Sequence, residues 1–454
     1  MVKENVRKED RNQADDEETQ VNIAVVKYWG KRDKRLILPC NSSLSVTLDQ
    51  QDLHTTTTAR LLDHPQEPHV PDTLWLNGSL QIVEEGSRLA TCLHALRRLK
   101  KLQEDQRAQA LPSNSSSDSS TPPVMILTPI VPFLFQPVSR RALVIGSENN
   151  FPTAAGLASS ASGFAALVYA ISKLYELPID MTELSKIARQ GSGSACRSMF
   201  GGFVSWEMGS SGDGTDSAAE EVAPRSHWPE MEALICVVSD RKKGTSSTSG
   251  MDVTVQTSAL LKHRVEQVVP ARMKEMKEAI GDKDFDRFAR LTMADSNQFH
   301  AVCLDSQPPI FYLNDVSRSI ITLIEELNRA SNAQGLGYVA AYTFDAGPNA
   351  VIYAPRYHMR TVLNLILHYF PMAHSEPFLD PKGHFDTSSE TPGQLAFPKN
   401  FNPDVSPIWP QGSISRLIHT QVGDGPRVIS TETGAGVLDL DGRPKSLGAS
   451  CGNS

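Results

Sequence analysis

The sequence predicts a two-domain α/β (α+β) protein. Its 454 residues exceed the usual size of one domain and are enough to bury a substantial core. Strand-like and helix-like hydrophobic patterns occur in both halves of the chain. A stretch rich in Gly, Ser and acidic residues at 209–227 is typical of a linker or an exposed excursion. We therefore expect an N-terminal domain over residues 21–215, a linker over 216–230 and a C-terminal domain over 231–454.

The N-terminal half begins with residues 1–20, which are mostly charged or polar and are predicted to be disordered. Asn77-Gly78 predicts a tight turn after a strand, and Asp180 with Glu183 predicts a capping box at a helix start. Strands are predicted on both sides of a loop after residue 21 and at 43–48, 55–62, 73–77, 142–145 and 203–206, and helices at 87–103, 164–175 and 180–190.

Residues 111–140 interrupt this pattern. A serine-rich tract at 113–120 is followed by an apolar segment that contains several prolines. Such a segment is typical of an inserted loop, and an error in the gene model such as a retained intron would produce the same appearance. We assign it no function.

The C-terminal half is predicted to start with a strand at residues 233–239. Beyond about residue 376 the sequence is rich in Pro and Gly, and we expect an irregular tail with one weak strand at 427–430. Further helices are predicted at 254–268, 271–280, 285–297 and 315–330, and strands at 338–344 and 350–353, around a turn at 345–349.

Charge and cysteine usage narrow the possible functions. The formal net charge of −8 argues against a general nucleic-acid or membrane-surface binder. The six cysteines are scattered singly, and neither they nor the histidines show the spacing of a metal site or a disulfide framework. No signal peptide is visible, so we expect reduced thiols and a cytosolic location.

The most informative run covers residues 150–163, NFPTAAGLASSASG, between a strand-like segment and a long apolar helix. Small residues allow the backbone to approach a ligand, and a helix N-terminus supplies unpaired N–H groups and a positive dipole end. Ser159 and Ser160 add hydroxyls suited to phosphate oxygens or a bound Mg²⁺. The run lacks the Gly-Lys-Ser/Thr of a Walker A loop. The alternative is a small-residue helix packed tightly on a neighbour.

The same run resembles the phosphate-binding motif of the GHMP kinase superfamily, Pro-x-x-x-Gly-Leu-Gly-Ser-Ser-Ala, with Ala158 in place of the second glycine. This variant is similar to that of one branch, the diphosphomevalonate decarboxylases. Three more segments agree with that branch in the right order, and the resemblance covers roughly residues 21–100 and 141–375. They are NIAVVKYWGKRD at 22–33, GSGSACRSMFGG at 191–202 and YTFDAGPNA at 342–350.

The resemblance implies a GHMP-type fold with the active site in the cleft between the domains. It implies ATP-dependent decarboxylation of (R)-5-diphosphomevalonate to isopentenyl diphosphate, with ADP, phosphate and CO₂ as the other products. ATP would be the co-substrate and Mg²⁺ would accompany it. It also implies a place in isoprenoid and sterol biosynthesis, a homodimer, and no nucleic-acid or membrane partner.

The resemblance implies that three residues carry the chemistry. Asp345 would accept or orient the proton of the substrate hydroxyl that attacks ATP, although an aspartate in such a turn is more often a plain turn residue. Arg197 would bind the substrate carboxylate and the charge that leaves as phosphate; alone, it could be a solvated surface charge. Lys27 would have a supporting charge role.

The remaining assignments concern binding. Alternatives stay open for several of these residues: the serines as turn formers, Arg88 as an exposed helix-start charge, and the loop of Thr248 as a flexible segment. The implied substrate-binding residues are Tyr28, Trp29, Gly30, Lys31, Arg88, Ser192, Gly193, Ser194, Ala195, Cys196, Arg197 and Thr248. The implied ATP-binding residues are Ala155, Gly156, Leu157, Ala158, Ser159 and Ser160. No protein metal site is predicted.

Two other functions fit parts of the sequence. One is a GHMP kinase that stops at the phosphorylated product, although those kinases usually carry a glycine-rich stretch where this chain has Asp345-Ala-Gly-Pro-Asn. The other is a non-catalytic relative. It gains some support because charged residues 15–20 stand where the family usually has an extended strand.

Overall fold

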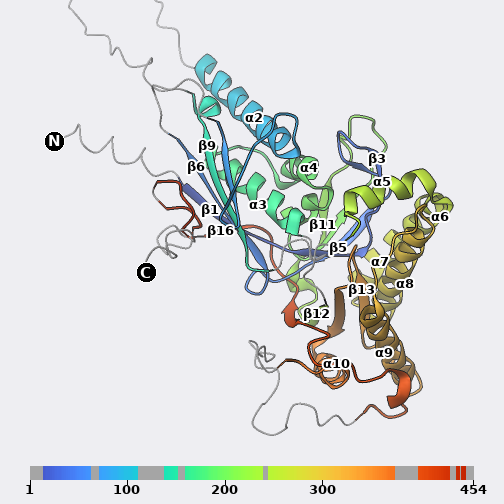
Figure 1. The fold of residues 1–454 in the computed structure, drawn as a ribbon. Coiled ribbons are helices and arrows are strands. Elements are labelled where there is room, and N and C mark those ends of the chain that lie inside the picture. Colours follow the sequence, from blue (N-terminus) through green and yellow to red (C-terminus); the bar gives the residue numbers. More distant parts are fainter. Residues whose placement is uncertain are drawn as a thin grey trace, which may run out of the picture.

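The computed structural model describes residues 14–62, 71–110, 137–151, 159–238, 244–373, 397–429, 436–439 and 441–445. Helices and strands are mixed in both halves of the chain, which confirms the predicted fold class (Figure 1). Most of the predicted insert at 111–140 lies outside these residues. Among the helices that the structure describes, none is long and apolar enough to cross a membrane.

A six-stranded sheet forms the framework of the N-terminal half. Its strands are β1 (Ala14–Gln20), β6 (His54–Leu61), β7 (Thr73–Leu76), β8 (Ser79–Gln81), β9 (Leu143–Asn149) and β16 (Arg427–Ile429). They lie in the order β16-β1-β6-β9-β7-β8, and only β7 and β9 run parallel. Asn77 and Gly78, both at positive φ, form the predicted turn between β7 and β8.

Three helices accompany this sheet: α2 (Arg88–Ala110), α3 (Ser159–Leu174) and α4 (Met181–Gly191). Helix α3 packs against β1 and β6, and both other helices contact it. Asp180 caps α4, because its side chain accepts a hydrogen bond from the Glu183 N–H at 2.8 Å, which is one half of the predicted capping box.

Strand β1 corrects the prediction of disorder over residues 1–20, which is wrong for 14–20; residues 1–13 are outside the described residues. The segment is charged, yet Asp16 and Glu17 are buried. Thr58 of β6 donates to Asp16, and Arg427 of β16 pairs with Glu18 at 2.6 Å. Pairing with strands distant in sequence therefore orders a segment that lacks a hydrophobic pattern.

A second sheet has four strands in the order β11-β10-β5-β2. Its strands are β2 (Asn22–Val26), β5 (Ser43–Thr47), β10 (Phe203–Trp206) and β11 (Ala219–Ala223). Strands β3 (Lys31–Asp33) and β4 (Leu38–Pro39) form a separate pair, and a 3-10 helix, η2 (Gly193–Met199), precedes β10. The predicted linker over 216–230 is wrong in part, since β11 lies within it and pairs with β10.

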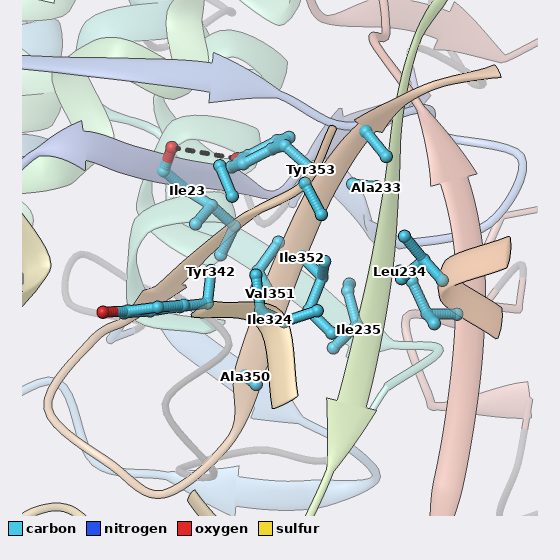
Figure 2. Packing of buried hydrophobic residues seen from close by; sticks show 14 of the residues in the cluster. Ile23, Ala233, Leu234, Ile235, Ile324, Tyr342, Ala350, Val351, Ile352 and Tyr353 are labelled. Atoms are coloured by element: carbon cyan, nitrogen blue, oxygen red, sulfur yellow. Dashed lines mark hydrogen bonds between the residues drawn. The ribbon is translucent and has the colours of Figure 1, made fainter. Parts of the chain in front are cut away.

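The C-terminal sheet has the order β13-β14-β12-β15. Its strands are β12 (Met231–Val237), β13 (Ala341–Phe344), β14 (Ala350–Pro355) and β15 (Arg416–Gln421), accompanied by α7 (Val269–Asp282), α8 (Phe285–Leu304), α9 (Asp315–Asn332) and α10 (Arg356–Tyr369). Figure 2 shows Val351 and Ile352 of β14 packed near Ile235 of β12. There the Tyr353 hydroxyl donates to the Ile23 carbonyl of β2 at 3.5 Å, so one core joins the two halves.

The helix predicted over residues 254–268 is divided. The structure has α5 (Ser247–Thr257), α6 (Ala259–His263) and a π-helical turn, η4 (Arg264–Val268). Ser258 causes the break, because its side chain accepts a hydrogen bond from the Leu261 N–H and starts a new helix.

The C-terminal tail, predicted as an irregular part of the domain over residues 231–454, contacts both halves of the molecule. Strand β15 joins the C-terminal sheet, but β16 returns to the N-terminal sheet and pairs with β1. Val437 and Leu438 then pack on Val144 of β9. The tail thus completes the N-terminal half of the molecule.

Candidate active site

A cavity of about 600 Å³ is lined by both halves of the chain. The β2–β3 connection, the start of α3 and η2 contribute from the N-terminal half. The start of α5 and the turn after β13 contribute from the C-terminal half. Most of the predicted site residues line this cavity: Lys27, Tyr28, Trp29, Lys31, Arg88, Ser159, Ser160, Ser192, Gly193, Ser194, Arg197, Thr248 and Asp345.

Lys27 and Asp345 form an ion pair across the cavity. Lys27 Nζ lies 2.6 Å from Asp345 Oδ1, and the lysine side chain is 3% exposed whereas the aspartate side chain is 28% exposed. Burial lowers the pKa of Lys27, while Asp345 and Asp295 act in the opposite direction. Among the described residues, the second oxygen of Asp345 has no hydrogen-bond partner. The carboxylate is therefore fixed at one oxygen and open to the cavity at the other.

Arg197 is a buried cation whose described partners are neutral. Its guanidinium donates to Asn22 Oδ1 at 3.3 Å, to Ser45 Oγ at 3.1 Å and to Ser43 Oγ. Burial lowers its pKa, but an arginine stays protonated in proteins. Within the described part of the chain no carboxylate lies at ion-pair distance from it. A buried positive charge with neutral partners is the arrangement that an anionic ligand would complete.

Tyr28 and Gly193 fit closely together beside Arg197. A Cβ atom on Gly193 would lie 2.8 Å from both Cε1 and the hydroxyl of Tyr28, so only glycine leaves room for the ring. The Tyr28 ring also packs on Trp206, with the centroids 4.7 Å apart. Its hydroxyl is buried without a hydrogen-bond partner among the described residues, and burial raises its pKa. The hydroxyl is thus an available donor at the cavity.

Two more cations, Lys31 and Arg88, line the cavity. Lys31 is 8% exposed, and burial together with the neighbouring Arg88 lowers its pKa. Asp252 partly offsets this effect. Lys31 and Arg88 both line the cavity, as Lys27 and Arg197 do. Several buried or partly buried positive charges in one cavity favour a ligand with more than one anionic group.

The described start of α3 lines the same cavity. Ser159 and Ser160 line the cavity, and Ser160 Oγ lies 3.2 Å from Ser192 Oγ at the start of η2. The predicted phosphate-binding residues Ala155, Gly156, Leu157 and Ala158 lie outside the described residues. The described start of α3 therefore adds hydroxyl groups to a cavity that also holds several cations and the Asp345 carboxylate.

Three predicted substrate-binding residues do not line the cavity. Ala195 and Cys196 are fully buried within η2, and the Cys196 thiol, whose pKa burial raises to about 12, donates to the Gly193 carbonyl. Gly30 has a φ of +89°, and a Cβ there would lie 2.9 Å from Val255. The structure gives these three positions a supporting place behind the cavity.

Family models match nearly the whole chain. The model described as the diphosphomevalonate decarboxylase-like N-terminal domain matches residues 19–219. The model described as the mevalonate 5-diphosphate decarboxylase C-terminal domain matches residues 233–429. The chain belongs to the diphosphomevalonate decarboxylase family.

Individual members of the family are similar over nearly their full length. The chain is 54% identical to the diphosphomevalonate decarboxylase of Ganoderma lucidum over 425 residues, which cover 94% of this chain and 97% of that protein. It is 47% identical to that of Saccharomyces cerevisiae, with 94% and 97% covered.

Solved structures of the family have the same fold. A crystal structure of mevalonate 5-diphosphate decarboxylase at 2.3 Å resolution superposes with a TM-score of 0.75 and 44% identity, covering 94% of this chain and 99% of that one. A structure of MDDEF in complex with MVAPP, AMPPCP and magnesium superposes with a TM-score of 0.63 and 27% identity, covering 92% and 99%.

In this family member, sequence reasoning missed several residues that shape the site. Asn22, Ser43 and Ser45 hold Arg197, and Asp295 on α8 accepts a hydrogen bond from the Lys27 N–H at 2.7 Å. Asn22 begins a segment that the sequence had singled out, but a lone serine or aspartate in a strand or helix gives no local signal of its contacts.

Proposed function

We propose that this chain converts (R)-5-diphosphomevalonate and ATP to isopentenyl diphosphate, ADP, phosphate and CO₂. The supporting observation is one cavity that holds the Lys27–Asp345 ion pair, the buried Arg197 and the start of α3. The ion pair suits proton transfer, the arginine suits a carboxylate or phosphate, and the helix start suits ATP phosphates.

In the first step, the 3-hydroxyl oxygen of the substrate attacks the γ-phosphorus of ATP. A bond forms between these atoms, the bond to the β-γ bridging oxygen breaks, and ADP leaves. Asp345, open to the cavity at one oxygen, accepts the hydroxyl proton or holds the hydroxyl in line. Lys27 at 2.6 Å keeps this carboxylate oriented.

In the second step, the bond between C3 and the phosphate oxygen breaks. Phosphate leaves with the electron pair, and positive character develops at C3. The electrons of the bond between C2 and the carboxylate carbon then form the C2–C3 double bond, and CO₂ is released. Arg197 binds the carboxylate before this step and stabilises the departing phosphate during it.

Two further cations of the cavity select the substrate. Lys31 and Arg88 bind the diphosphate, and the Tyr28 hydroxyl donates to it. Ser192, Ser194 and Thr248 line the same cavity and add hydroxyl groups. Because these groups match a diphosphate, mevalonate and its monophosphate would be poorer substrates.

Mg²⁺ would enter with ATP. The described residues contain no group of three His, Cys, Asp or Glu side chains that could hold a metal by themselves. The hydroxyls of Ser159 and Ser160, which line the cavity, fit a cation bound mainly through nucleotide phosphates and water. When bound, Mg²⁺ would neutralise charge on the phosphates.

Carboxyl-labelled diphosphomevalonate tests this function and separates it from its alternatives. A decarboxylase releases labelled CO₂ and ADP in equal amounts. A kinase that stops at phosphorylation releases ADP without CO₂, and a non-catalytic relative releases neither. Replacing the substrate by mevalonate or its monophosphate in the same assay tests the role of the diphosphate; comparable rates on all three would contradict it.

Location and assembly are further parts of the proposal. We infer a cytosolic enzyme of isoprenoid and sterol synthesis that acts as a homodimer, as the family resemblance implies. The described cysteines are all free thiols, which agrees with a reducing compartment. Light scattering after size-exclusion chromatography would measure the mass of the assembly against the 49.7 kDa of one chain.

A further inference from the structure

A buried ion pair holds the main chain at Lys27. Arg264 of η4 and Asp295 of α8 are both 0% exposed, and Arg264 Nη1 lies 2.8 Å from Asp295 Oδ1. Asp295 Oδ2 accepts the Lys27 N–H at 2.7 Å. Arg264 Nη2 donates to the Lys27 carbonyl at 3.0 Å. Both polar groups of the Lys27 backbone therefore bind one and the same ion pair.

Lys27 needs such support because it lies beyond the sheet. Strand β2 ends at Val26, and its pairing with β5 already shifts register between Ala24 and Val26. Apart from Arg264, the Lys27 carbonyl accepts a hydrogen bond from Asn41 at 2.9 Å. The ladder of the sheet thus fixes the chain up to β2, and side chains from the other half of the molecule fix it at the catalytic lysine.

The ion pair is itself completed by further contacts. Arg272 lies 2.9 Å from Asp295 Oδ1, and Gln298 accepts hydrogen bonds from both arginines. Burial alone would raise the pKa of Asp295, but the two arginines lower it overall. Asp295 is thus a charged acceptor that can bind the Lys27 N–H without losing its arginines.

We propose that Arg264 and Asp295 are positioning residues, which hold the Lys27 backbone so that its ammonium meets Asp345. This inference rests on the proposed function for the roles of Lys27 and Asp345. Neither Arg264 nor Asp295 lines the cavity. Their effect on the reaction is therefore indirect and passes through Lys27.

Asp295→Asn tests the proposal, because the amide keeps the shape but loses the charge that binds the two arginines. Misplacement of a catalytic group by about 1 Å can cost roughly 100-fold, so we expect kcat to fall by about that factor. KM for diphosphomevalonate should change by less than about threefold, since the diphosphate contacts are on other residues. Unchanged kcat in folded protein would overturn the proposal.

A double-mutant cycle separates positioning from general loss of structure. If Asp295 acts through Lys27, adding Asp295→Asn to Lys27→Met should cause no further loss of kcat. Multiplicative losses would contradict the proposal. Arg272→Gln is the matched control, because Arg272 binds Asp295 but does not contact Lys27; its kcat should stay within about threefold of wild type.

A second variant and a second measurement keep the test decisive. If Asp295→Asn does not fold, Arg264→Lys retains the charge but lacks the planar fork that binds Asp295 and the Lys27 carbonyl together, and it should show the same kcat loss. A crystal structure of the variant gives a readout without activity. Nζ of Lys27 should lie beyond the present 2.6 Å from Asp345, and an unchanged pair would refute the positioning role. Full activity of Lys27→Met would instead count against the proposed function.

Discussion

The Asp345 carboxylate forms an ion pair with Lys27 and lines the cavity. Asp345→Asn retains the shape and removes the charge, so proton acceptance from the substrate hydroxyl should fail. Loss of a general base costs on the order of 10²–10⁴ in rate, and we expect kcat to fall by that factor. Substrate binding should change little, as measured by titration. If the folded variant kept more than about a tenth of the wild-type kcat, Asp345 would not be the general base.

Gly193 should not accept even one methyl group. Its Cβ would lie 2.8 Å from the Tyr28 ring, and overpacking of this kind costs about 1–3 kcal/mol. Because Tyr28 must move, Gly193→Ala should lower the thermal midpoint and raise KM for diphosphomevalonate. Gly163→Ala is the control: it lines the same cavity, but its Cβ would meet nothing within 4 Å. Equal effects of the two changes would contradict the argument.

Most of the site residues predicted from motifs do line the cavity, since Lys27, Arg197 and Asp345 stand in segments that resemble the family. The motifs did not predict Asp295 or Arg264. A single aspartate within α8 has the same local context as many surface residues, and only tertiary packing shows that it reaches the Lys27 N–H. Motif residues can be predicted from sequence, whereas the residues that hold them require coordinates.

The start of helix α4 is determined by residues close together in the sequence. Asp180 accepts the Glu183 N–H, and loss of an N-cap costs about 0.5–2 kcal/mol. Asp180→Ala should therefore lower the free energy of unfolding by roughly 1 kcal/mol in chemical denaturation. Asp180→Asn, which retains a capping oxygen, should remain near wild type. If both variants lost the same stability, charge rather than the cap would be responsible.

Helix α8 brings a buried histidine close to the Lys27–Asp345 ion pair. His300 is 8% exposed and contacts Phe299 and Phe344. Burial lowers its pKa to about 3, and Lys27 adds to this effect. Below pH 6.5 the unfolded chain therefore binds a proton that the folded chain does not, so stability falls as the pH decreases from about 6.5 toward 3.

This proton linkage predicts that the wild type and the His300→Phe variant differ in the pH dependence of their stability. Because of His300, the free energy of unfolding should fall by about 1 kcal/mol between pH 6.5 and 5.5. His300→Phe fits the same aromatic surroundings without a titrating group, so its thermal midpoint should fall less steeply over that interval. Parallel curves for the two proteins would show that His300 takes up its proton in the folded state.

Many elements with a clear pattern were predicted, including β10 and α9, but β1 and α10 were not. Strand β1 consists of charged and polar residues, and its order comes from β6 and β16, which lie far away in the sequence. Helix α10 was missed although its buried residues Met359, Val362, Leu363 and Ile366 follow a helical spacing. The first error reflects long-range pairing, whereas the second signal was present in the sequence.

For the molecule as a whole, the tail is part of the N-terminal half. Leu438 is 1% exposed and packs with Val144 and Val437 over Gly146 of β9. Leu438→Ala should lower the free energy of unfolding by about 2–5 kcal/mol, as for other buried leucines. Val428→Ala on β16, where the side chain is 56% exposed, should stay within about 0.5 kcal/mol. If Leu438→Ala lowered the free energy of unfolding as little as Val428→Ala, the tail would not be part of the core.

The pairing of β1 with β16 has a consequence for synthesis on the ribosome. Strand β1, the first described strand, pairs with β16 near the other end of the described chain. In the contact between Glu18 and Arg427, the two residues are 409 positions apart in the sequence. Until β16 leaves the exit tunnel, one side of β1 stays open to other chains. The nascent protein must therefore keep an unfinished sheet edge protected at least until β16 has been synthesised and has emerged.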